Sequence, residues 1–570
     1  MRRLVSLLLA LLLVLSVPAY ATGEDIAAQR QEDLDTLYEI LKESHPNLFA
    51  NTSEEAFLAK KAEIESRLAS VDDATFALDL QSLVAMVGDS HTAINISSVL
   101  SSGNLFPVSI RWFDGAWVVS GLPEGEAAYL GWTIETLNDQ TMEQVCEKLG
   151  NLLSSDNPIK LRRQVRQCIA SAEVLAYTGV VDAGEDLRLG LAGPDGEQAE
   201  VVLPPLSAAD TAAWPQIVQL SSLRQETPAT AAQDRYYFSL DLGSAYYIQF
   251  NTCQEDPELP MDTFAAQVAK DLAAKDYERV LIDLRNNGGG SDGVLVPILM
   301  LLAPMVRSGA VEVWGLVGET TFSSAAINAM EIREMGGYLA GEATSGSVDH
   351  FGSVSAFRLP NTGIQVQFST KYITLADYLE CAWGLGVTAI QPDWEVPQTL
   401  EDYLAGRDTV VDALLAREEP FSPEEPELLS RGRFIAKLRQ TVGAQADTWG
   451  MPFDDVFPFN WYTPDIMWAV ETGIVTGKTE GVFAPGVPIT WEQAAVLVER
   501  YLDAAGVELP IVQEGEAPGW VDALTHDWAR PAVEAAWRHG LLPGNYDARV
   551  AMGCGEEQKF LDRLAAALAS

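Results

Sequence analysis

Positive charge is scarce in this sequence. Its 570 residues hold 37 Lys and Arg against 81 Asp and Glu, so the formal net charge is −44 at pH 7. Nucleic acid and anionic lipid carry charge of the same sign and would be repelled. The acidic residues are spread along the chain rather than gathered in one tail, as on a strongly solvated extracellular surface. The composition therefore argues against nucleic acid or anionic lipid as a partner.

Cysteine is also sparse. The five cysteines are odd in number and widely scattered, at Cys146, Cys168, Cys253, Cys381 and Cys554. No spacing between them matches a zinc site or a disulfide-rich scaffold. At least one is therefore free or paired to another chain. We expect small buried apolar residues, with room for one disulfide.

Only one apolar run stands out, and it lies at the start of the chain. Two arginines precede the run Leu4 to Val17, and an Ala-Tyr-Ala step ends at Ala21. A charged start, an apolar stretch too short to span a bilayer and an A-x-A end predict a secretory signal peptide over residues 1–21. No later run is long and apolar enough to cross a membrane. The sequence therefore predicts a secreted, extracellular protein without a membrane span.

The remaining chain is 48% hydrophobic overall and long enough for about three to four domains. Helical spacing of apolar residues predicts an N-terminal helical part, and alternating strands and helices predict an α/β core further on. The expected parts are a helical segment at 24–100, a small β-rich and helical insertion at 105–205, an α/β core at 235–400, a linker at 401–427, and helical repeats at 428–510 and 517–570.

Two short runs in the core carry the chemistry. The first, Val280 to Gly290, indicates a buried strand that leads into three glycines. The second ends on Ser323 and Ser324, just where a helical pattern begins. Glycines let backbone N–H groups approach a substrate, and a serine at a helix N-terminus lies beside the free N–H groups of the first turn. Together they predict a serine nucleophile with an oxyanion hole.

These runs belong to four ordered blocks that resemble the C-terminal-processing/tricorn-type serine peptidases. The blocks are Asp283-Leu-Arg-Asn-Asn-Gly-Gly-Gly, Thr321-Phe-Ser-Ser-Ala, Gly341-Glu-Ala-Thr-Ser-Gly and Pro392-Asp393. The resemblance spans roughly residues 33–396 and implies an α/β, crotonase/ClpP-like peptidase core. It also implies hydrolysis of peptide bonds through an acyl-enzyme, without a metal or organic cofactor.

The resemblance implies a role for each serine. In the family the reactive serine follows Thr and one variable residue, which gives Ser323 as the nucleophile. Ser324 is the alternative nucleophile, and otherwise it caps the following helix. The oxyanion hole is then formed by the N–H of Ser324 and a glycine N–H, for which we expect Gly289.

The general base differs between branches of the family. Lys-type members place a Lys in a Gly-Lys step about two dozen residues after the serine, and this chain has Ser347 there. Instead, Ser90 and His91 form the pair found in tricorn-type members, in which the His is the base and the preceding Ser helps to orient it. The sequence therefore favours a Ser–His mechanism. Glu380, the nearest Glu before Pro392-Asp393, is the expected fourth member of the relay.

Three further residues are possible members of the site. His45, in a motif that some relatives carry, is expected to pack at a helix end. His350 lies close enough in sequence to the family blocks to line the cleft. Lys371 is expected to be an ordinary strand residue.

The insertion resembles a reduced peptide-binding module of the PDZ type. Short strands and a helix over residues 107–152 carry this resemblance, which implies capture of a chain end by strand addition. A purely structural insertion that shapes the cleft is the other reading, and both stay open. The helix predicted over residues 161–176 has arginines on one face, which we expect to be solvated.

The C-terminal part resembles surface-layer homology (SLH) domains. One complete copy runs from Pro452 to about Thr490, a degenerate copy follows over 517–570, and residues 429–438 resemble half of another. Relatives bind cell-wall polysaccharide through a Thr-Arg-Ala-Glu-like step, of which Ser430-Arg431 keeps the Arg and Thr490-Trp491 does not. The expectation is wall association, with a folded but non-binding appendage as the alternative.

The sequence as a whole predicts a secreted, cell-wall-associated serine endopeptidase. The main alternative is a catalytically inactive surface protein that keeps the peptidase fold as a peptide-binding or scaffolding module. A third possibility is another acyl hydrolase that uses the same Ser–His pair.

Overall fold

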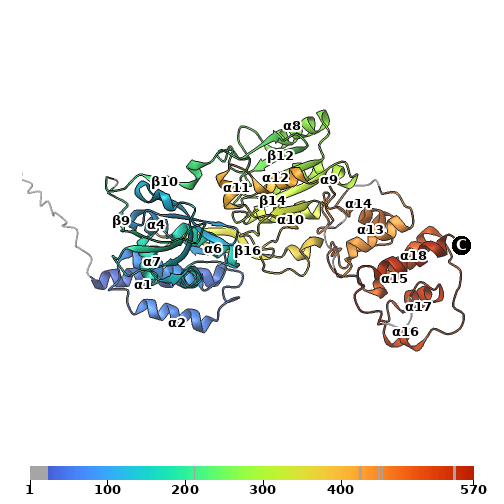
Figure 1. Cartoon of the computed structure of the whole chain (residues 1–570). Coiled ribbons are helices and arrows are strands. Elements are labelled where there is room, and N and C mark those ends of the chain that lie inside the picture. Colours follow the sequence, from blue (N-terminus) through green and yellow to red (C-terminus); the bar gives the residue numbers. More distant parts are fainter. Residues whose placement is uncertain (1–22, 211, 423–426, 447–449, 452, 543–546) are drawn as a thin grey trace, which may run out of the picture.

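The structure, a computed structural model, describes residues 23–210, 212–422, 427–446, 450–451, 453–542 and 547–570. The predicted signal peptide at 1–21 lies outside these residues. Figure 1 shows three bodies in chain order, coloured from blue at the N-terminal part to red at the C-terminal helices. No helix in the described ranges is long and apolar enough to cross a membrane.

The N-terminal body begins with helices, as the sequence predicts. They are α1 (Gly23–Ser44), α2 (Glu54–Glu65), α3 (Asp73–Ala85) and the short α4 (Ser97–Ser102). Ser53 and Asp72 cap α2 and α3 by accepting backbone N–H groups. The apolar residues at helical spacing on α1, such as Leu34, Leu37 and Leu41, are fully buried in the core that these helices share with the insertion.

The insertion forms a seven-stranded sheet with the order β10-β4-β5-β7-β8, and with β3 and β6 paired at its side. Its elements are β2 (Asn104–Leu105), β3 (Ser109–Phe113), β4 (Ala116–Pro123), β5 (Thr133–Leu137), β6 (Gln140–Thr141), α5 (Met142–Gly150), α6 (Pro158–Cys168), α7 (Ala172–Tyr177), β7 (Leu187–Ala192), β8 (Gln198–Leu203), β9 (Leu206–Ser207) and β10 (Ile217–Gln219). The helix predicted over 161–176 is therefore two helices. Its arginines are half-buried rather than solvated, so that expectation was wrong.

The core holds a six-stranded sheet in which β12, β13, β14, β15 and β18 run parallel and β11 is an antiparallel edge. Its strands in order are β11 (Tyr237–Asp241), β12 (Ala245–Phe250), β13 (Arg279–Asp283), β14 (Glu312–Val317), β15 (Tyr338–Gly341) and β18 (Trp394–Glu395). Successive strand residues face opposite sides, so the sheet buries two apolar faces. Val280 and Ile282 pack under the helices α8 (Met261–Ala274), α9 (Val296–Arg307) and α10 (Ser324–Glu334).

The other face of the sheet is covered by residues that the sequence placed in a linker. Leu281 and Trp314 pack against α12 (Thr409–Ala416), and α11 (Leu400–Leu404) precedes it. Arg285 at the end of β13 pairs with Asp408 at the start of α12. Residues 400–416 are thus part of the core rather than an extended linker, and residues 423–426 of the predicted linker lie outside the described ranges.

A hairpin joins the N-terminal body to the core. Strands β16 (His350–Arg358) and β17 (Gln365–Ile373) pair with each other, and β17 also pairs with β1 (Ala93–Ile94) in the register Ala93 to Gln367. Because His91 lies two residues before β1 and His350 begins β16, this small sheet brings both histidines to the core. Lys371 lies in β17, as predicted.

The C-terminal body is helical and closes on itself. Its helices are α13 (Arg431–Thr441), α14 (Thr463–Glu471), α15 (Trp491–Ala505), α16 (Gly519–Ala523), α17 (Arg530–Arg538) and α18 (Glu556–Leu568). The N–H groups of Leu429, Met552 and Ile489 donate to the carbonyls of Met552, Ile489 and Leu429 respectively, at 2.8–2.9 Å. Three segments of this body thus form a ring of backbone hydrogen bonds.

This body is docked onto the core. Tyr462 donates its hydroxyl hydrogen bond to the buried carboxylate of Glu334 on α10, and Arg433 pairs with Glu380. Burial, with the nearby charge of Glu380, raises the pKa of Glu334 to about 7. None of the five cysteines, all of which lie in the described ranges, forms a disulfide, so the optional disulfide is not formed.

Candidate active site

Ser323 lies at a sharp turn between the end of β14 and the start of α10. Its backbone has φ 54° and ψ −129°, a conformation that residues with a Cβ rarely adopt. Such strain persists only where surrounding contacts impose it, and it is found at functional sites. Ser323 is the N-cap residue of α10, yet its side chain makes no capping hydrogen bond. The hydroxyl therefore remains available, as a nucleophile at a strand-to-helix turn requires.

Hydrogen bonds around Thr321 impose this turn. Its hydroxyl donates to the carbonyl of Leu284 at 2.9 Å and accepts from the N–H of Gly318 at 3.1 Å. Its carbonyl accepts from the N–H of Gly346 at 3.0 Å, and the N–H of Phe322 donates to the carbonyl of Asn287 at 3.2 Å. The serine loop is thus tied to the ends of both β13 and β15.

The glycine loop lies directly against the serine. Gly289 has φ 107°, and a Cβ built on it would lie 2.7 Å from the Cβ of Ser323, so only glycine fits this contact. The N–H of Gly289 donates to Oδ1 of Asn287 at 2.9 Å. The hydroxyl of Ser324 donates to the carbonyl of Gly290 at 2.8 Å, so this side chain binds the glycine loop and does not cap α10.

His91 lies beside the residue that precedes Ser323. Its ring is stacked on Phe322, with centroids 4.5 Å apart, and on His350, with centroids 5.5 Å apart. The side chain is buried, and neither ring nitrogen has a hydrogen-bond partner among the described residues. The structure thus places the His91 ring beside Phe322, the residue before Ser323, with both ring nitrogens unpartnered within the described residues.

Asp89 is the carboxylate next to His91. Its Oδ1 accepts the backbone N–H of His91 at 2.8 Å and lies 4.0 Å from Nδ1 of the ring. Its Oδ2 accepts hydrogen bonds from Nε2 of His45 at 3.2 Å, from the hydroxyl of Thr92 at 2.5 Å and from the hydroxyl of Ser369 at 2.6 Å. Burial alone would raise the pKa of Asp89, but these hydrogen bonds outweigh burial and hold the pKa below its ordinary value. Asp89 is therefore a buried negative charge beside the imidazole.

His91 itself is held in its neutral form. Burial lowers its pKa to about 3, and the charges of His350 and Lys160 act in the same direction, against Asp89. A neutral imidazole is the form in which His acts as a general base. Lys160 on α6 lies 3.6 Å above the Phe322 ring, and burial with the charge of Arg163 lowers its pKa to about 8.

Ser90 is placed differently from its expected role. Its hydroxyl donates to Oδ1 of Asp156 at 2.7 Å, and the hydroxyl of Ser347 donates to the same oxygen at 3.0 Å. Burial raises the pKa of this Asp156 carboxyl. Ser90 therefore anchors the His91 turn to the insertion, and Ser347, at the family's Lys position, joins the same network.

His350 is the second histidine beside His91. Its Nδ1 lies 2.9 Å from the carbonyl of Ser347, which places a proton on Nδ1. Nε2 is buried and unpartnered within the described chain. That His350 lines a cleft stays a prediction.

The structure does not bring Glu380 to His91. The side chain of Glu380 faces the C-terminal body, where its Oε1 accepts from Nε of Arg433 at 2.6 Å. His45 does more than pack at a helix end, because it binds the carboxylate beside His91. Asp89 was missed at the sequence level, although its place two residues before His91 was the available signal. Across the described ranges, no group of three or more His, Cys, Asp or Glu side chains is placed to hold a metal ion.

Comparison with known proteins identifies the C-terminal body. Residues 452–495 match the family model of the S-layer homology domain, so the chain carries such a domain. An endoglucanase of Bacillus sp. (strain KSM-635) is 35% identical over 127 residues, which are 22% of this chain. An S-layer protein of Bacillus thuringiensis subsp. finitimus is 32% identical over 113 residues, which are 20% of this chain. The chain spans 13% of the length of each of these relatives.

Several solved structures are similar to this chain over about two-thirds of its length. Mature CPAF in complex with lactacystin is 13% identical, with a TM-score of 0.46 over 66% of this chain and 95% of that chain. The photosystem II D1 C-terminal processing protease is 16% identical, with a TM-score of 0.32 over 67% and 98%. The tricorn protease is 14% identical, with a TM-score of 0.32 over 68% and 36%. The chemistry of this chain is therefore assigned from its own residues.

Proposed function

We propose that this chain is a secreted, cell-surface serine endopeptidase that forms an acyl-enzyme at Ser323. The observation that carries the proposal is the strained, uncapped Ser323, which lies against Gly289 while the ring of His91 stacks on the neighbouring Phe322. A nucleophile, a neutral base and a glycine loop in contact are the parts that acyl transfer needs.

The reaction follows from these roles. His91 takes the proton of the Ser323 hydroxyl as its oxygen attacks the peptide carbonyl, and then returns that proton to the leaving amine. Water, deprotonated by the same imidazole, then attacks the ester; the bond to Oγ of Ser323 breaks, the imidazolium returns its proton to that oxygen, and the acid product leaves. The imidazolium formed in each step is stabilised by the negative charge of Asp89 at 4.0 Å. We therefore assign the orienting carboxylate to Asp89 in place of Glu380.

The oxyanion hole is proposed at the start of α10. The N–H of Ser324 is a first-turn amide, and it is one donor for the developing negative charge. Gly289 is the second proposed donor, since its backbone touches Ser323. Its N–H bonds the Asn287 side chain in the resting site, so the oxyanion shares this donor or displaces Asn287 Oδ1.

Attachment to the cell wall is proposed for the C-terminal body, through polysaccharide bound by its repeats. The support is the S-layer homology match at 452–495 and the closed ring of backbone hydrogen bonds among Leu429, Ile489 and Met552. Purified protein should sediment with wall fragments that retain their polysaccharide, and should stay in the supernatant with fragments stripped of it. Equal sedimentation with both preparations would contradict the proposal.

Turnover of casein and of a simple aryl ester tests the enzyme. Wild-type protein should cleave casein, and Ser323→Ala and His91→Ala should each lose about a thousandfold or more of that rate while keeping their melting temperatures. Ester turnover without casein turnover would favour a different acyl hydrolase. Absence of both in the wild type would favour an inactive scaffold.

A further inference from the structure

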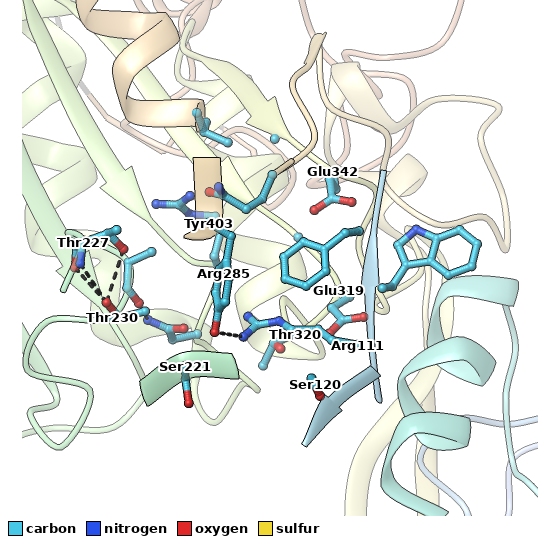
Figure 2. A pocket seen from close by; sticks show the side chains of 18 of the residues that line it. Arg111, Ser120, Ser221, Thr227, Thr230, Arg285, Glu319, Thr320, Glu342 and Tyr403 are labelled. Carbon is cyan, nitrogen blue, oxygen red and sulfur yellow. Dashed lines mark hydrogen bonds between the residues drawn. The ribbon is translucent and has the colours of Figure 1, made fainter. Parts of the chain in front are cut away.

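A cavity of about 600 Å³ lies between the insertion and the core. Its walls come from β3, from α6, from the segment after β10 and from the loops that follow β14 and β15. Figure 2 shows Arg111 and Tyr403 joined by a hydrogen bond within this space, with Glu319 and Glu342 nearby. Ser221 also lines the cavity and is exposed, so the cavity opens to solvent there. No residue that we assign to acyl transfer lines it.

Arginine dominates the lining, in a chain with a large excess of acidic residues. Six arginines line the cavity: Arg111, Arg162, Arg166, Arg224, Arg285 and Arg407. Arg166, Arg285 and Arg407 form ion pairs with neighbouring carboxylates. The other three, the unpaired arginines Arg111, Arg162 and Arg224, have no ion pair within the described residues.

The charges that face the cavity do not cancel. Its lining holds two carboxylates, Glu319 and Glu342, and Glu319 is already paired with Arg166. Three unpaired arginines therefore face one unpaired carboxylate, an excess of two positive charges. Burial raises the pKa of Glu342, so its negative charge is itself disfavoured. A ligand with two negative charges would balance this excess.

The unpaired arginines are partly desolvated without being satisfied. The Nε atoms of Arg162 and Arg224 are buried and have no hydrogen-bond partner among the described residues. Burial lowers the pKa of Arg111, and the like charges of Arg166 and Arg224 act in the same direction. Burial also lowers the pKa of Arg162. Positive charges thus lie near one another and are poorly solvated, a free-energy cost that an anion between them would recover.

Aromatic rings hold these guanidinium groups in position. Arg111 and Arg224 lie 4.9 and 4.2 Å from the ring of Tyr403, and the Tyr403 hydroxyl accepts from Arg111 at 3.1 Å. Arg162 lies 4.5 Å from the ring of Trp112. Stacking fixes the plane of a guanidinium and leaves its N–H edge free to bind an oxyanion.

The number of donors favours a phosphate group over a carboxylate. A carboxylate has two oxygens, and one guanidinium fork can satisfy both of them. Here three guanidinium groups come from β3, from α6 and from the residue after the short helix Leu220–Leu223. The hydroxyl groups of Ser109, Ser120 and Ser221 line the same space. A phosphate group has more acceptor oxygens and a charge of about −1.5 to −2 at pH 7, which fits both the donors and the charge excess.

We propose that this cavity, the arginine cavity, is a binding site for a phosphate group held by Arg111, Arg162 and Arg224. The ligand is a free phosphate ion or a phosphate monoester, because both present the same tetrahedral anion. Glu342 faces the same ligand and lowers its affinity by repulsion. The site does not depend on the proposed peptidase function, since its residues take no part in acyl transfer.

Calorimetric titration of the purified full chain tests the proposal. The ligands are inorganic phosphate, glycerol 3-phosphate and acetate, each at pH 8 and at equal ionic strength, so that screening is the same in every titration. At least one of the two phosphates should bind tenfold or more tightly than acetate, and the tighter of the two shows whether the free ion or the ester is preferred. Acetate binding as tightly as both phosphates, or no binding of either phosphate in calorimetry and in thermal unfolding, would overturn the proposal.

Variants of the lining locate the binding. Arg162→Gln and Arg224→Gln, made singly, should each weaken phosphate binding roughly tenfold or more. Arg188→Gln removes the same charge from an exposed surface pair of the insertion and should change nothing. If one cavity variant fails to fold, the other tests the site from a different element. Unchanged affinity in a folded cavity variant contradicts the assignment.

A variant of Glu342 tests the site in the opposite direction. Glu342→Gln keeps the shape of the side chain but removes the negative charge that faces the ligand, so phosphate should bind several-fold more tightly. The same substitution should leave the affinity for acetate low. Weaker phosphate binding by a folded Glu342→Gln protein would show that the ligand does not lie among these charges.

Discussion

The carboxylate of Asp89 lies 4.0 Å from Nδ1 of His91, and its other oxygen lies 3.2 Å from Nε2 of His45. The backbone N–H of Asn47 donates to Nδ1 of His45, so the proton of that ring is on Nε2 and faces Asp89. The carboxylate is thus fixed from one side by His45 and is available on the other side to His91. This arrangement gives the base a fixed negative neighbour without Glu380.

Replacing Asp89 should slow catalysis more than it weakens substrate binding. Asp89→Asn keeps the shape but removes the charge that stabilises the imidazolium, so kcat should fall by about a hundredfold or more, with KM little changed. Steady-state kinetics on a peptide substrate measure this split. Asp79→Asn, which removes another buried carboxylate from the N-terminal body, is the matched control and should keep kcat. Equal kcat in wild type and Asp89→Asn would contradict the role assigned to Asp89 in the mechanism.

Two adjacent glycines should respond in opposite ways to a methyl group. Gly289→Ala places a Cβ 2.7 Å from the Cβ of Ser323 and 2.9 Å from the carbonyl of Phe322, so activity should be lost and the melting temperature lowered. Gly288→Ala meets nothing within 4 Å and should keep both. Casein turnover and thermal unfolding of the pair measure the effect. An active Gly289→Ala protein would show that the loop does not touch the nucleophile as described.

The pH dependence of kcat/KM should report the depressed pKa of His91. Burial and nearby positive charge lower this pKa from 6.5 to about 3, and the base works only when deprotonated. Activity should therefore persist as the pH falls through 6.5 and decline only well below it. An acid limb at or above 6.5 would contradict the buried, neutral His91.

Replacing Lys160 tests directly whether nearby positive charge lowers the pKa of His91. Lys160→Met removes a positive charge that disfavours the imidazolium, so the pKa of His91 rises and the acid limb moves to higher pH. Lys148→Met removes an exposed lysine of the same insertion and should leave the limb in place. The comparison is made on full pH profiles, with circular dichroism at each pH to confirm folding.

Glu380 should matter for docking of the C-terminal body rather than for catalysis. Glu380→Gln breaks its ion pair with Arg433, which is partly exposed, so the melting temperature should fall by no more than about 4 °C. Because kcat on casein should stay within about twofold of wild type, the two readouts separate the roles. A large loss of kcat would show that Glu380 takes part in catalysis, as the sequence predicted.

Local patterns in the sequence were sufficient to predict the α/β core. The apolar run that became β13, the three glycines after it and the helix that begins at Ser324 each carry their own signal, so nucleophile and glycine loop could be placed together. The helices of residues 24–87 were equally predictable from their apolar spacing. The fold of residues 400–416 could not be predicted in the same way. They were assigned to a linker, yet α12 is a helix that packs on the sheet face opposite α8, α9 and α10, a contact between distant segments.

Contacts between distant segments could not be predicted in this way. His91 reaches Phe322 through the pairing of β1 with β17, whose register joins Ala93 to Gln367. Glu380 has the expected place in the sequence, yet Arg433 of the C-terminal body binds it. The arginines of α6 were predicted to be solvated. They are half-buried because β3 and the core pack beside α6, and burial of this kind is a property of the assembled fold.

The position of a covalent label on the protein tests the central claim most directly. Wild-type protein is treated with a fluorophosphonate, digested and sequenced by mass spectrometry, beside Ser323→Ala and Ser324→Ala. Ser323 should carry the label in the wild type and in Ser324→Ala, because the Ser324 hydroxyl is bound to the carbonyl of Gly290. Ser323→Ala should carry none. A label on Ser324, or an unlabelled wild-type protein, would contradict the assignment of Ser323 as the nucleophile.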